Sequence, residues 1–271
     1  MRFLIAQVLP YITVTIFTLG VLYRLGRWAG ARRVHNINLS PWVPDSGQMT
    51  VRIGTEAFLF RSLWIFDKGL WVGAIAMHLA LLNIIGGHIV GFGFLGEQFA
   101  YIPGITVEMS KAASDMLGKI FGIILFVALA YLLLRRLTIP AVKQVNRTSD
   151  IFWLVFLLAL VGIGNLMRFV YEFHMPYEHI YAYMAHLFTF QSVMGLPALD
   201  NYFFLAHFLL VQIMLILLPF SKLLHLFGMF GMRWLLHQPY QDPAPGLPNV
   251  DVQAARRAGL GVPAGDSSGG V

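Results

Sequence analysis

Four of the nine histidines lie inside long apolar stretches of the sequence, where an unpaired polar side chain costs several kcal/mol. His78 and His88 are ten residues apart in the stretch 69–94, and His207 and His225 are eighteen apart in the stretch 201–227. Eighteen residues make five helical turns, so one helix over 201–227 would carry both rings on one face, about 27 Å apart. Imidazoles inside apolar helices are functional candidates, because they can relay protons, bond to neighbouring helices or ligate a metal.

The composition indicates what kind of scaffold positions these histidines. Of 271 residues, 58% are hydrophobic and 12% are charged, whereas soluble globular chains carry about 25% charged residues. The sequence therefore predicts an all-α integral membrane protein. It contains no cysteine, which excludes disulfides and thiolate-ligated metal sites within this chain. Redox chemistry would thus need histidine-ligated centres or the centres of a partner.

Five apolar stretches are long enough to cross a bilayer. They cover about residues 3–23, 69–94, 112–134, 150–171 and 201–227. Lys and Arg gather after the first, third and fifth stretches and before the second, while the other two loops carry glutamates. By the positive-inside rule, this asymmetry predicts a multi-pass protein with its N-terminus outside and its C-terminus in the cytoplasm. The first stretch is too long for the apolar part of a signal peptide, so we expect an uncleaved helix.

The chain is expected to divide near residue 235. Residues 1–235 form the predicted five-helix domain, and residues 236–271 form a polar tail, rich in Pro and Gly, that is expected to be cytoplasmic and largely flexible. The net charge of +6 does not indicate a nucleic-acid partner, because the basic residues lie beside the apolar stretches. Basic residues in these positions are expected to contact membrane lipid. Pro219 is expected to break the last helix.

The predicted topology makes the helices at 69–94 and 201–227 antiparallel, which pairs their histidines by depth. His78 and His225 then lie nearer the cytoplasm, and His88 and His207 lie nearer the outside. Two imidazoles that face each other across a helical bundle suit six-coordinate haem b, whose role is electron transfer. The pattern therefore predicts a di-haem bundle in which these four histidines are the axial iron ligands. Two alternatives stay open: a haem-free proton-coupled transporter with a histidine relay, and a structural anchor whose histidines only form hydrogen bonds.

The spacing H-x9-H on the second stretch, H-x17-H on the fifth, and the string LPFSKLLHLF resemble the γ-subunit cytochrome b family of respiratory nitrate reductases. Within that family, WVGAIAMH, SDIFWLVFLLALVGIGNLMRFVYEF and PFSKLLHLFGMF are most like the DsrM branch, the cytochrome b subunit of the Dsr membrane complex of sulfur-metabolising prokaryotes. The resemblance covers residues 1 to about 235. It implies a protein of the inner membrane of a prokaryote.

The resemblance also implies a function and partners. The chain would exchange electrons between the quinone pool (menaquinone or ubiquinone) and a cytoplasmic iron–sulfur subunit, as the electron-transfer subunit of a larger membrane complex in dissimilatory sulfur metabolism. A quinone site is implied beside the haem of His88 and His207. Lys111 in VEMSK is the nearest counterpart of a lysine that helps form this site in the nitrate reductase branch. The alternative is the γ subunit of a respiratory nitrate reductase, with the same chemistry and another partner.

Two further residues are candidates. Arg168, near the outer end of the stretch 150–171, could pair with a haem propionate, because guanidinium binds carboxylate bidentately; otherwise it only reaches the interface as a snorkelling arginine. His186 lies with His174 and His179 in an outer loop, where near-neutral bases could accept the protons that a quinol releases. The same loop could instead be a solvated interfacial helix or a loose metal site.

Overall fold

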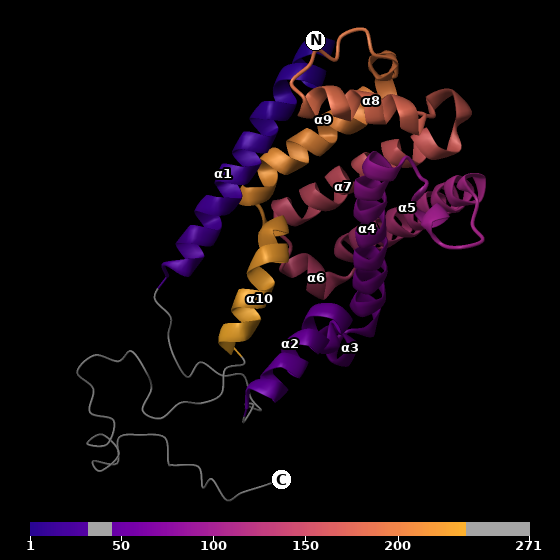
Figure 1. The fold of residues 1–271 in the computed structure, drawn as a ribbon. Helices are drawn as coiled ribbons and strands as arrows, with labels where there is room; N and C mark the ends of the chain where they lie inside the picture. The colour runs from indigo at the N-terminus through magenta and orange to yellow at the C-terminus, as the bar shows by residue number, and fades with distance from the viewer. Residues whose placement is uncertain (32–44, 237–271) are drawn as a thin grey trace, which may run out of the picture. The chain divides into compact units, whose positions relative to one another are not determined.

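A computed structural model describes residues 1–31 and 45–236 of the chain. The described residues contain helices and no strand, and five of the helices are long and apolar enough to cross a membrane. These five cover Leu4–Ala29, Lys68–Gly91, Val107–Thr138, Thr148–Phe169 and Tyr202–Phe220 (Figure 1). The all-α architecture with five spans is therefore confirmed. The predicted tail beyond residue 236 lies outside the described residues.

The helices have the following bounds. The spans are η1 (Leu4–Val8) with α1 (Leu9–Ala29), α4 (Lys68–Phe94), α5 (Val107–Thr138), α7 (Thr148–Phe169) and α9 (Tyr202–Leu217). The shorter helices are α2 (Ser46–Leu59), α3 (Arg61–Phe66), α6 (Pro140–Gln144), α8 (Tyr177–Phe188) and α10 (His225–Leu236). Single 3₁₀ turns are η2 (Gln98–Tyr101), η3 (Tyr171–Phe173), η4 (Pro197–Asp200), η5 (Leu218–Phe220) and η6 (Lys222–Leu224).

The chain forms two compact units. Unit 1 comprises Met1–Arg24 and Phe60–Lys222, and unit 2 comprises Leu25–Leu59 and Leu223–Val271. Unit 1 holds α4, α5, α7 and α9 together with most of α1. Unit 2 holds α2 and α10.

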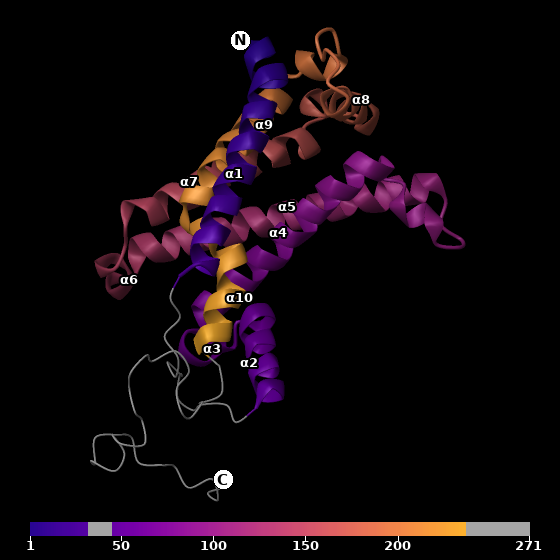
Figure 2. The ribbon, with the colours of Figure 1, turned by 60° about the vertical axis from the view of Figure 1, so that its left-hand side comes forward.

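In unit 1 the spanning helices alternate in direction. α4 packs along α5, α5 along α7, and α7 against α9 (Figures 1 and 2). Ala80 of α4 and Leu125 and Leu129 of α5 form a buried cluster, to which α7 adds apolar side chains. Tyr131 of α5 donates a hydrogen bond to the carbonyl of Gly69, 3.1 Å away, so the end of α5 meets the start of α4. This antiparallel order agrees with the expected topology, while the side of the membrane on which each end lies stays a prediction.

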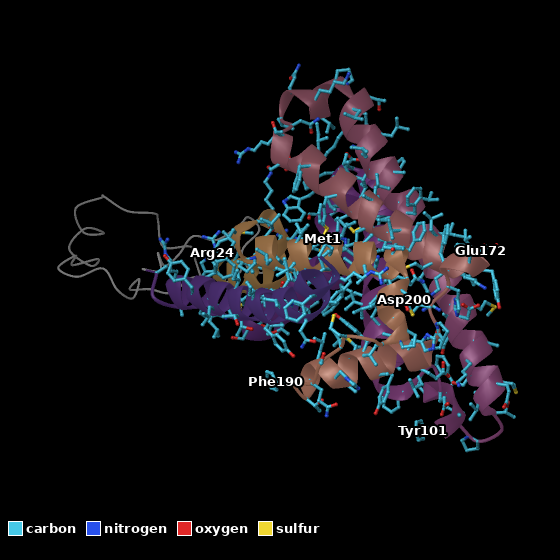
Figure 3. All side chains as sticks on the ribbon, turned by 90° about the horizontal axis from the view of Figure 1, so that it is seen from above. Met1, Arg24, Tyr101, Glu172, Phe190 and Asp200 are labelled. Atoms are coloured by element: carbon cyan, nitrogen blue, oxygen red, sulfur yellow. The ribbon has the colours of Figure 1, made fainter. Side chains whose placement is uncertain are left out.

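The start of α1, α8 and the start of α9 meet at one end of unit 1, named here the α8 end. Tyr183 of α8 is fully buried and donates a hydrogen bond to the carbonyl of Ala6, 2.7 Å away. Burial raises the pKa of Tyr183 above its ordinary value. Arg2 forms an ion pair at 3.0 Å with Asp200, which Figure 3 labels. The first contact holds α8 against η1, and the second ties the beginning of the chain to η4, which precedes α9.

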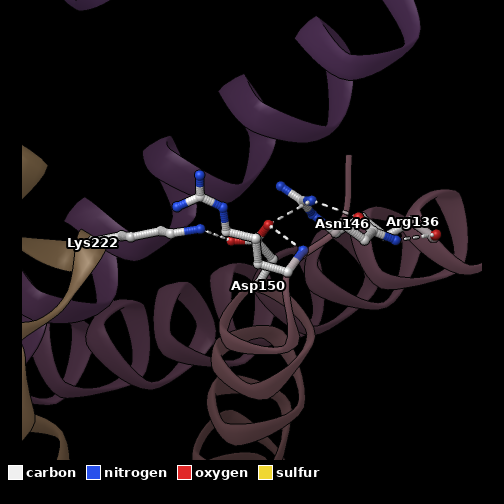
Figure 4. Close-up of polar contacts among 5 residues, drawn as sticks. Arg136, Asn146, Asp150 and Lys222 are labelled. Atoms are coloured by element: carbon white, nitrogen blue, oxygen red, sulfur yellow. Dashed lines mark hydrogen bonds and ion pairs between the residues drawn. The ribbon is translucent and has the colours of Figure 1, made fainter. Parts of the chain in front are cut away.

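The opposite end of unit 1, named the α6 end, is held by one carboxylate. Asp150 at the start of α7 pairs with Lys222 through one oxygen and with Arg136 at the end of α5, at 3.2 Å, through the other (Figure 4). Arg136 also donates a hydrogen bond to Asn146 at 2.8 Å. Because the Asp150 side chain is only 11% exposed, water screens these pairs less than it screens surface pairs. Asp150 therefore joins α5, α7 and the chain beyond α9.

The stretch 201–227 is not a single helix. α9 ends at Leu217 and is followed by the 3₁₀ turn η5. Ser221 is extended (φ −115°, ψ 173°), and a second 3₁₀ turn, η6, precedes α10, which begins at His225. His207 and His225 therefore belong to different helices, and the expectation of five regular turns between them on one face is wrong.

Pro219 accounts for this break, as expected from its position. Proline has no N–H for a continuing helix, and Pro219 is fully buried against Gly20 of α1, where an added side-chain carbon would lie 2.7 Å from it. Arg24 donates a hydrogen bond to the carbonyl of Pro219, 3.2 Å away, so a carbonyl near the helix end keeps a donor. The pairing of Lys222 with Asp150 holds the chain just after the break.

Unit 2 is held together by α2 and α10. Arg233 of α10 forms an ion pair with Glu56 of α2 at 3.7 Å, and the ring centroids of Phe58 and Phe230 lie 6.4 Å apart. Glu56 is buried, at 9% exposure, and Arg233 gives its charge a partner within the unit. His225, the first residue of α10, places one of the four candidate ligands in this unit.

Replacing Tyr183 by Phe tests the contact that holds α8. The substitution removes a buried hydroxyl and leaves the Ala6 carbonyl without its donor, which costs about 1–3 kcal/mol. We expect a lower thermal unfolding midpoint in detergent, followed by circular dichroism. Tyr181→Phe on the same helix is the matched control, because Tyr181 is 48% exposed. Equal destabilisation by both substitutions would contradict a role for the buried hydrogen bond.

Candidate functional site

The structure brings His88 and His207 side by side within unit 1. Their ring centroids lie 6.3 Å apart, and the ring planes are inclined by 13°. His88 lies near the end of α4, and His207 lies in the second turn of α9. Both positions are nearer the α8 end than the α6 end, so the pair lies at a shared depth, as the sequence pattern predicts.

A backbone carbonyl determines the tautomer of each ring. Nδ1 of His88 lies 2.6 Å from the carbonyl oxygen of Ile84, and Nδ1 of His207 lies 3.1 Å from that of Leu160 on α7. A carbonyl oxygen only accepts hydrogen bonds, so each Nδ1 carries the proton and donates it. A neutral imidazole protonated at Nδ1 has its lone pair on Nε2, which is the usual arrangement of metal-ligating histidines.

Glycines on two helices leave room around these rings. A side-chain carbon added at Gly164 of α7 would lie 3.1 Å from the ring of His207, closer than such contacts normally come. Gly164 follows Leu160 by four residues, so one turn of α7 both supplies the carbonyl and admits the ring. On α4, a carbon added at Gly86 or Gly87 would meet no neighbouring atom within 4 Å. The surface of α4 just before His88 is therefore open.

The pair has the separation that one iron with two axial imidazoles requires. A ligating imidazole nitrogen lies about 2 Å from a first-row metal, so two rings on opposite sides of it have centroids about 6 Å apart. The observed 6.3 Å, the near-parallel planes and the Nδ1 contact of each ring to a carbonyl fit haem b. In the part of the chain that the structure describes, no cluster of three or more His, Asp or Glu side chains suits another metal ion.

His78 and His225 belong to different units, and their pairing stays a prediction. Nδ1 of His78 donates to the carbonyl of Ala74, 2.8 Å away, which is the same bond that His88 makes to Ile84. The ring of Phe60 meets the ring of His78 edge-on at 5.0 Å, and Phe60 has a left-handed backbone (φ 48°, ψ 46°). Such a backbone is costly for an aromatic residue and is found preferentially beside functional groups.

Arg168 of α7 is fixed by two neighbours. Its Nη1 lies 3.3 Å from a carboxylate oxygen of Asp115 on α5 and donates to the hydroxyl of Tyr177 at 3.0 Å. The guanidinium also lies 5.5 Å from the centroid of the Tyr177 ring and packs beside Gly118. An arginine held in this way differs from one that only reaches for the interface. Its pairing with a propionate stays a prediction.

The two predicted quinone-site residues do not meet in one contact. Lys111 lies in the second turn of α5 rather than in the preceding loop, and it pairs with Glu97 at 3.3 Å and with Glu178 of α8 at 3.5 Å. A hydrogen bond from its own backbone N–H, together with Lys111, lowers the pKa of Glu178. His186 lies eight residues beyond Glu178, about 12 Å along α8, and its Nδ1 donates to the carbonyl of Ser192.

The partners of Arg168 did not stand out from the sequence pattern. Asp115 did carry a signal, because it is a carboxylate inside a predicted apolar span, where ionisable groups are functional candidates. Tyr177 carried none, since aromatic residues are common at the ends of membrane spans. Gly164 could be recognised only once the approach of His207 to α7 was known.

Two shallow grooves on the described surface lie away from these residues. One, of about 640 Å³, runs along α7 from Asn146 to Ala159, and the other, of about 370 Å³, lies between Phe126 and Phe169. No predicted site residue lines either groove. The candidate site is therefore defined by side chains that meet between helices.

Known proteins of redox complexes are similar to this chain. The Hdr-like menaquinol oxidoreductase cytochrome b-like subunit of Archaeoglobus fulgidus is 27% identical over 260 residues, which cover 82% of this chain and 76% of that protein. The protein of the same name from Archaeoglobus profundus is 28% identical over 296 residues, with coverages of 93% and 87%. The respiratory nitrate reductase 2 gamma chain of Escherichia coli is 25% identical over 228 residues, with coverages of 82% and 88%.

Residues 55–242 match the family model described as nitrate reductase gamma subunit. This range is more than half of the chain, and it includes the four candidate histidines and Arg168. The resemblance indicated by the histidine spacings is confirmed at the level of the family. The chain belongs to the nitrate reductase gamma subunit family.

Proposed function

We propose that this chain is a membrane cytochrome b subunit that exchanges electrons between the quinone pool and a cytoplasmic iron–sulfur partner. The observation that carries the proposal is the near-parallel pair of His88 and His207, each with Nδ1 bonded to a carbonyl. Similarity to proteins named as a menaquinol oxidoreductase subunit and as a nitrate reductase chain supports it.

Two haems b are proposed as cofactors, one held by His88 and His207 and one held by His78 and His225. Haem b with two axial imidazoles supplies one-electron transfer and has no open coordination position for a substrate. The arginine Arg168 is proposed to contact a propionate through the guanidinium nitrogens other than Nη1, which Asp115 and Tyr177 already engage.

The residues around His88 and His207 hold each ring in one orientation. The carbonyl of Ile84 orients the ring of His88, and the carbonyl of Leu160 orients the ring of His207. Gly164 keeps the second contact short, since any side chain there would press on the ring. Ligands held in this way need little rearrangement when the iron changes its charge, which favours electron transfer.

Quinone, either menaquinone or ubiquinone, is proposed to bind at the α8 end beside His88 and His207. Oxidation of a quinol releases two electrons and two protons, so the site needs nearby groups that hold and pass protons. Lys111 and His186 remain the candidates for this role. Lys111 offers a cation held between two carboxylates, and His186 offers an imidazole on α8. Reduction of quinone would use the same groups in reverse.

The α6 end is proposed to face the cytoplasm and the iron–sulfur partner. Arg136, Lys143, Arg147 and Lys222 gather there with Asp150, and a surplus of cations is typical of the cytoplasmic side. The proposed setting is the inner membrane of a prokaryote, in a complex with further membrane subunits that serves dissimilatory sulfur metabolism. A nitrate reductase partner would use the same chemistry in another complex.

A dithionite-reduced minus oxidised spectrum of the purified protein tests the proposal. We expect the α-band of b-type haem and two haems per chain. Replacing His88 or His207 by Ala should remove the same haem, and replacing His78 or His225 should remove the other. A haem-free protein would overturn the proposal and favour the transporter or the anchor. Crossed phenotypes, in which His88 and His225 lose the same haem, would overturn the pairing.

Gly164→Ala tests whether α7 sets the position of His207. The added methyl group would press on the ring, and overpacking of about 1–3 kcal/mol corresponds to a roughly fivefold to 150-fold weakening of haem retention at the His88 and His207 site. Haem content and the reduced spectrum report the effect. Gly162→Ala is the matched control, because its added carbon would meet Phe126 at an ordinary 3.5 Å. Equal haem loss in both variants would contradict the role assigned to Gly164.

A further inference from the structure

We propose that Arg168 and Asp115 form a charge pair that tunes the reduction potential of the centre at His88 and His207, Arg168 raising it and Asp115 lowering it. The inference rests on the proposed haem at these two histidines. It concerns the charge of the two side chains, and neither of them needs to touch the haem.

The backbone of Arg168 lies about one helical turn beyond the part of α7 that contacts His207. An added side-chain carbon at Gly164 would meet the ring of His207 at 3.1 Å, which places that turn of α7 against the ring. Arg168 follows Gly164 by four residues on the same face, about 6 Å further toward the α8 end.

A second series of contacts connects Arg168 to α4. Tyr177, which accepts a hydrogen bond from Arg168 at 3.0 Å, lies with its ring against Gly91, where an added carbon would be 3.7 Å away. Gly91 follows His88 by three residues, which is about one turn. Arg168 is therefore connected to the surroundings of the pair along both α7 and α4.

The charge of Arg168 is also fixed in place. Asp115 and Tyr177 both engage Nη1, the Tyr177 ring lies beside the guanidinium, and Gly118 lets the guanidinium rest directly on α5. A mobile surface arginine would be screened by water, whereas a fixed and partly buried one acts through a lower effective dielectric constant. Its side chain is 31% exposed.

Asp115 neutralises only part of the positive charge of Arg168 and Lys119. One carboxylate oxygen pairs with Arg168 at 3.3 Å, and the other pairs with Lys119 at 2.6 Å. The three side chains together carry a net charge of about +1, and removal of one charge changes that total by one unit. Lys111 forms a separate cluster at the same end with Glu97 and Glu178.

The sign of each effect follows from electrostatics. One-electron reduction adds one negative charge to the centre, so a nearby cation favours the reduced form and a nearby anion disfavours it. A unit charge one to two turns away in partly buried surroundings changes such an equilibrium by about tenfold, which for one electron is about 59 mV.

A redox titration of the purified full-length protein, followed by its haem absorbance, tests the inference. The component of interest is the one that His88→Ala removes. We expect Arg168→Gln to lower its midpoint potential and Asp115→Asn to raise it, each by about tenfold in the reduction equilibrium. Arg168→Lys should keep the potential near that of the unchanged protein, because the charge remains. Lys143→Gln is the matched control, since it removes one exposed cation at the α6 end.

Shifts of the same sign in Arg168→Gln and Asp115→Asn would overturn the inference, because a disturbance of structure alone moves both in one direction. The inference would also be overturned if neither substitution shifted the midpoint potential, or if the shift were confined to the haem component that His88→Ala leaves intact. If Arg168→Gln fails to retain haem, Asp115→Asn must still raise the potential. A protein without haem, or one in which His88→Ala removes none, would overturn the proposed function itself.

Discussion

The ring of His207 reaches the carbonyl of Leu160 because Gly164, one turn later on α7, has no side chain. This contact determines which nitrogen of His207 carries the proton and how its plane is turned. On the other side, the carbonyl of Ile84 does the same for His88, and the two planes come within 13° of parallel. The candidate centre thus depends on α7, which contributes neither histidine but positions one of them.

The remainder of unit 1 holds these helices in register at their two ends. At the α8 end, the buried hydroxyl of Tyr183 ties α8 to η1, which precedes α1 in the first span. At the α6 end, Asp150 ties α7 to α5 and to Lys222 beyond α9. Together these contacts tie helices to one another at both ends of unit 1. A separation of 6.3 Å between two rings from different helices needs such support.

Much of the fold could be predicted, because apolar length and charge asymmetry are direct consequences of the bilayer. The depth match of His88 and His207 followed from that topology. The course of the chain after α9 could not be predicted in this way. Pro219 indicates a break in the helix, but it indicates neither the extended Ser221 nor the start of α10. The predicted span begins at about residue 112, whereas α5 already includes Lys111, because Thr106 accepts a hydrogen bond from the backbone of Met109 and caps the helix earlier.

The side-chain contacts of the site were less predictable than its helices. Arg168 could be singled out as a cation inside a span, but its partner Asp115 lies 53 residues away on another helix. Gly164 is one of several glycines in apolar stretches, and only the approach of His207 separates it from Gly162. Spacing along one helix is readable from sequence, whereas contacts between helices depend on how they cross.

The central claim is that His88 and His207 are the two axial ligands of one haem, and low-temperature electron paramagnetic resonance tests it most directly. The oxidised His78→Ala variant isolates this haem. Axial rings held within 13° of parallel predict a low-spin ferric signal with three well-separated g values. A high-spin signal, or the strongly anisotropic low-spin signal of perpendicular rings, would contradict the account.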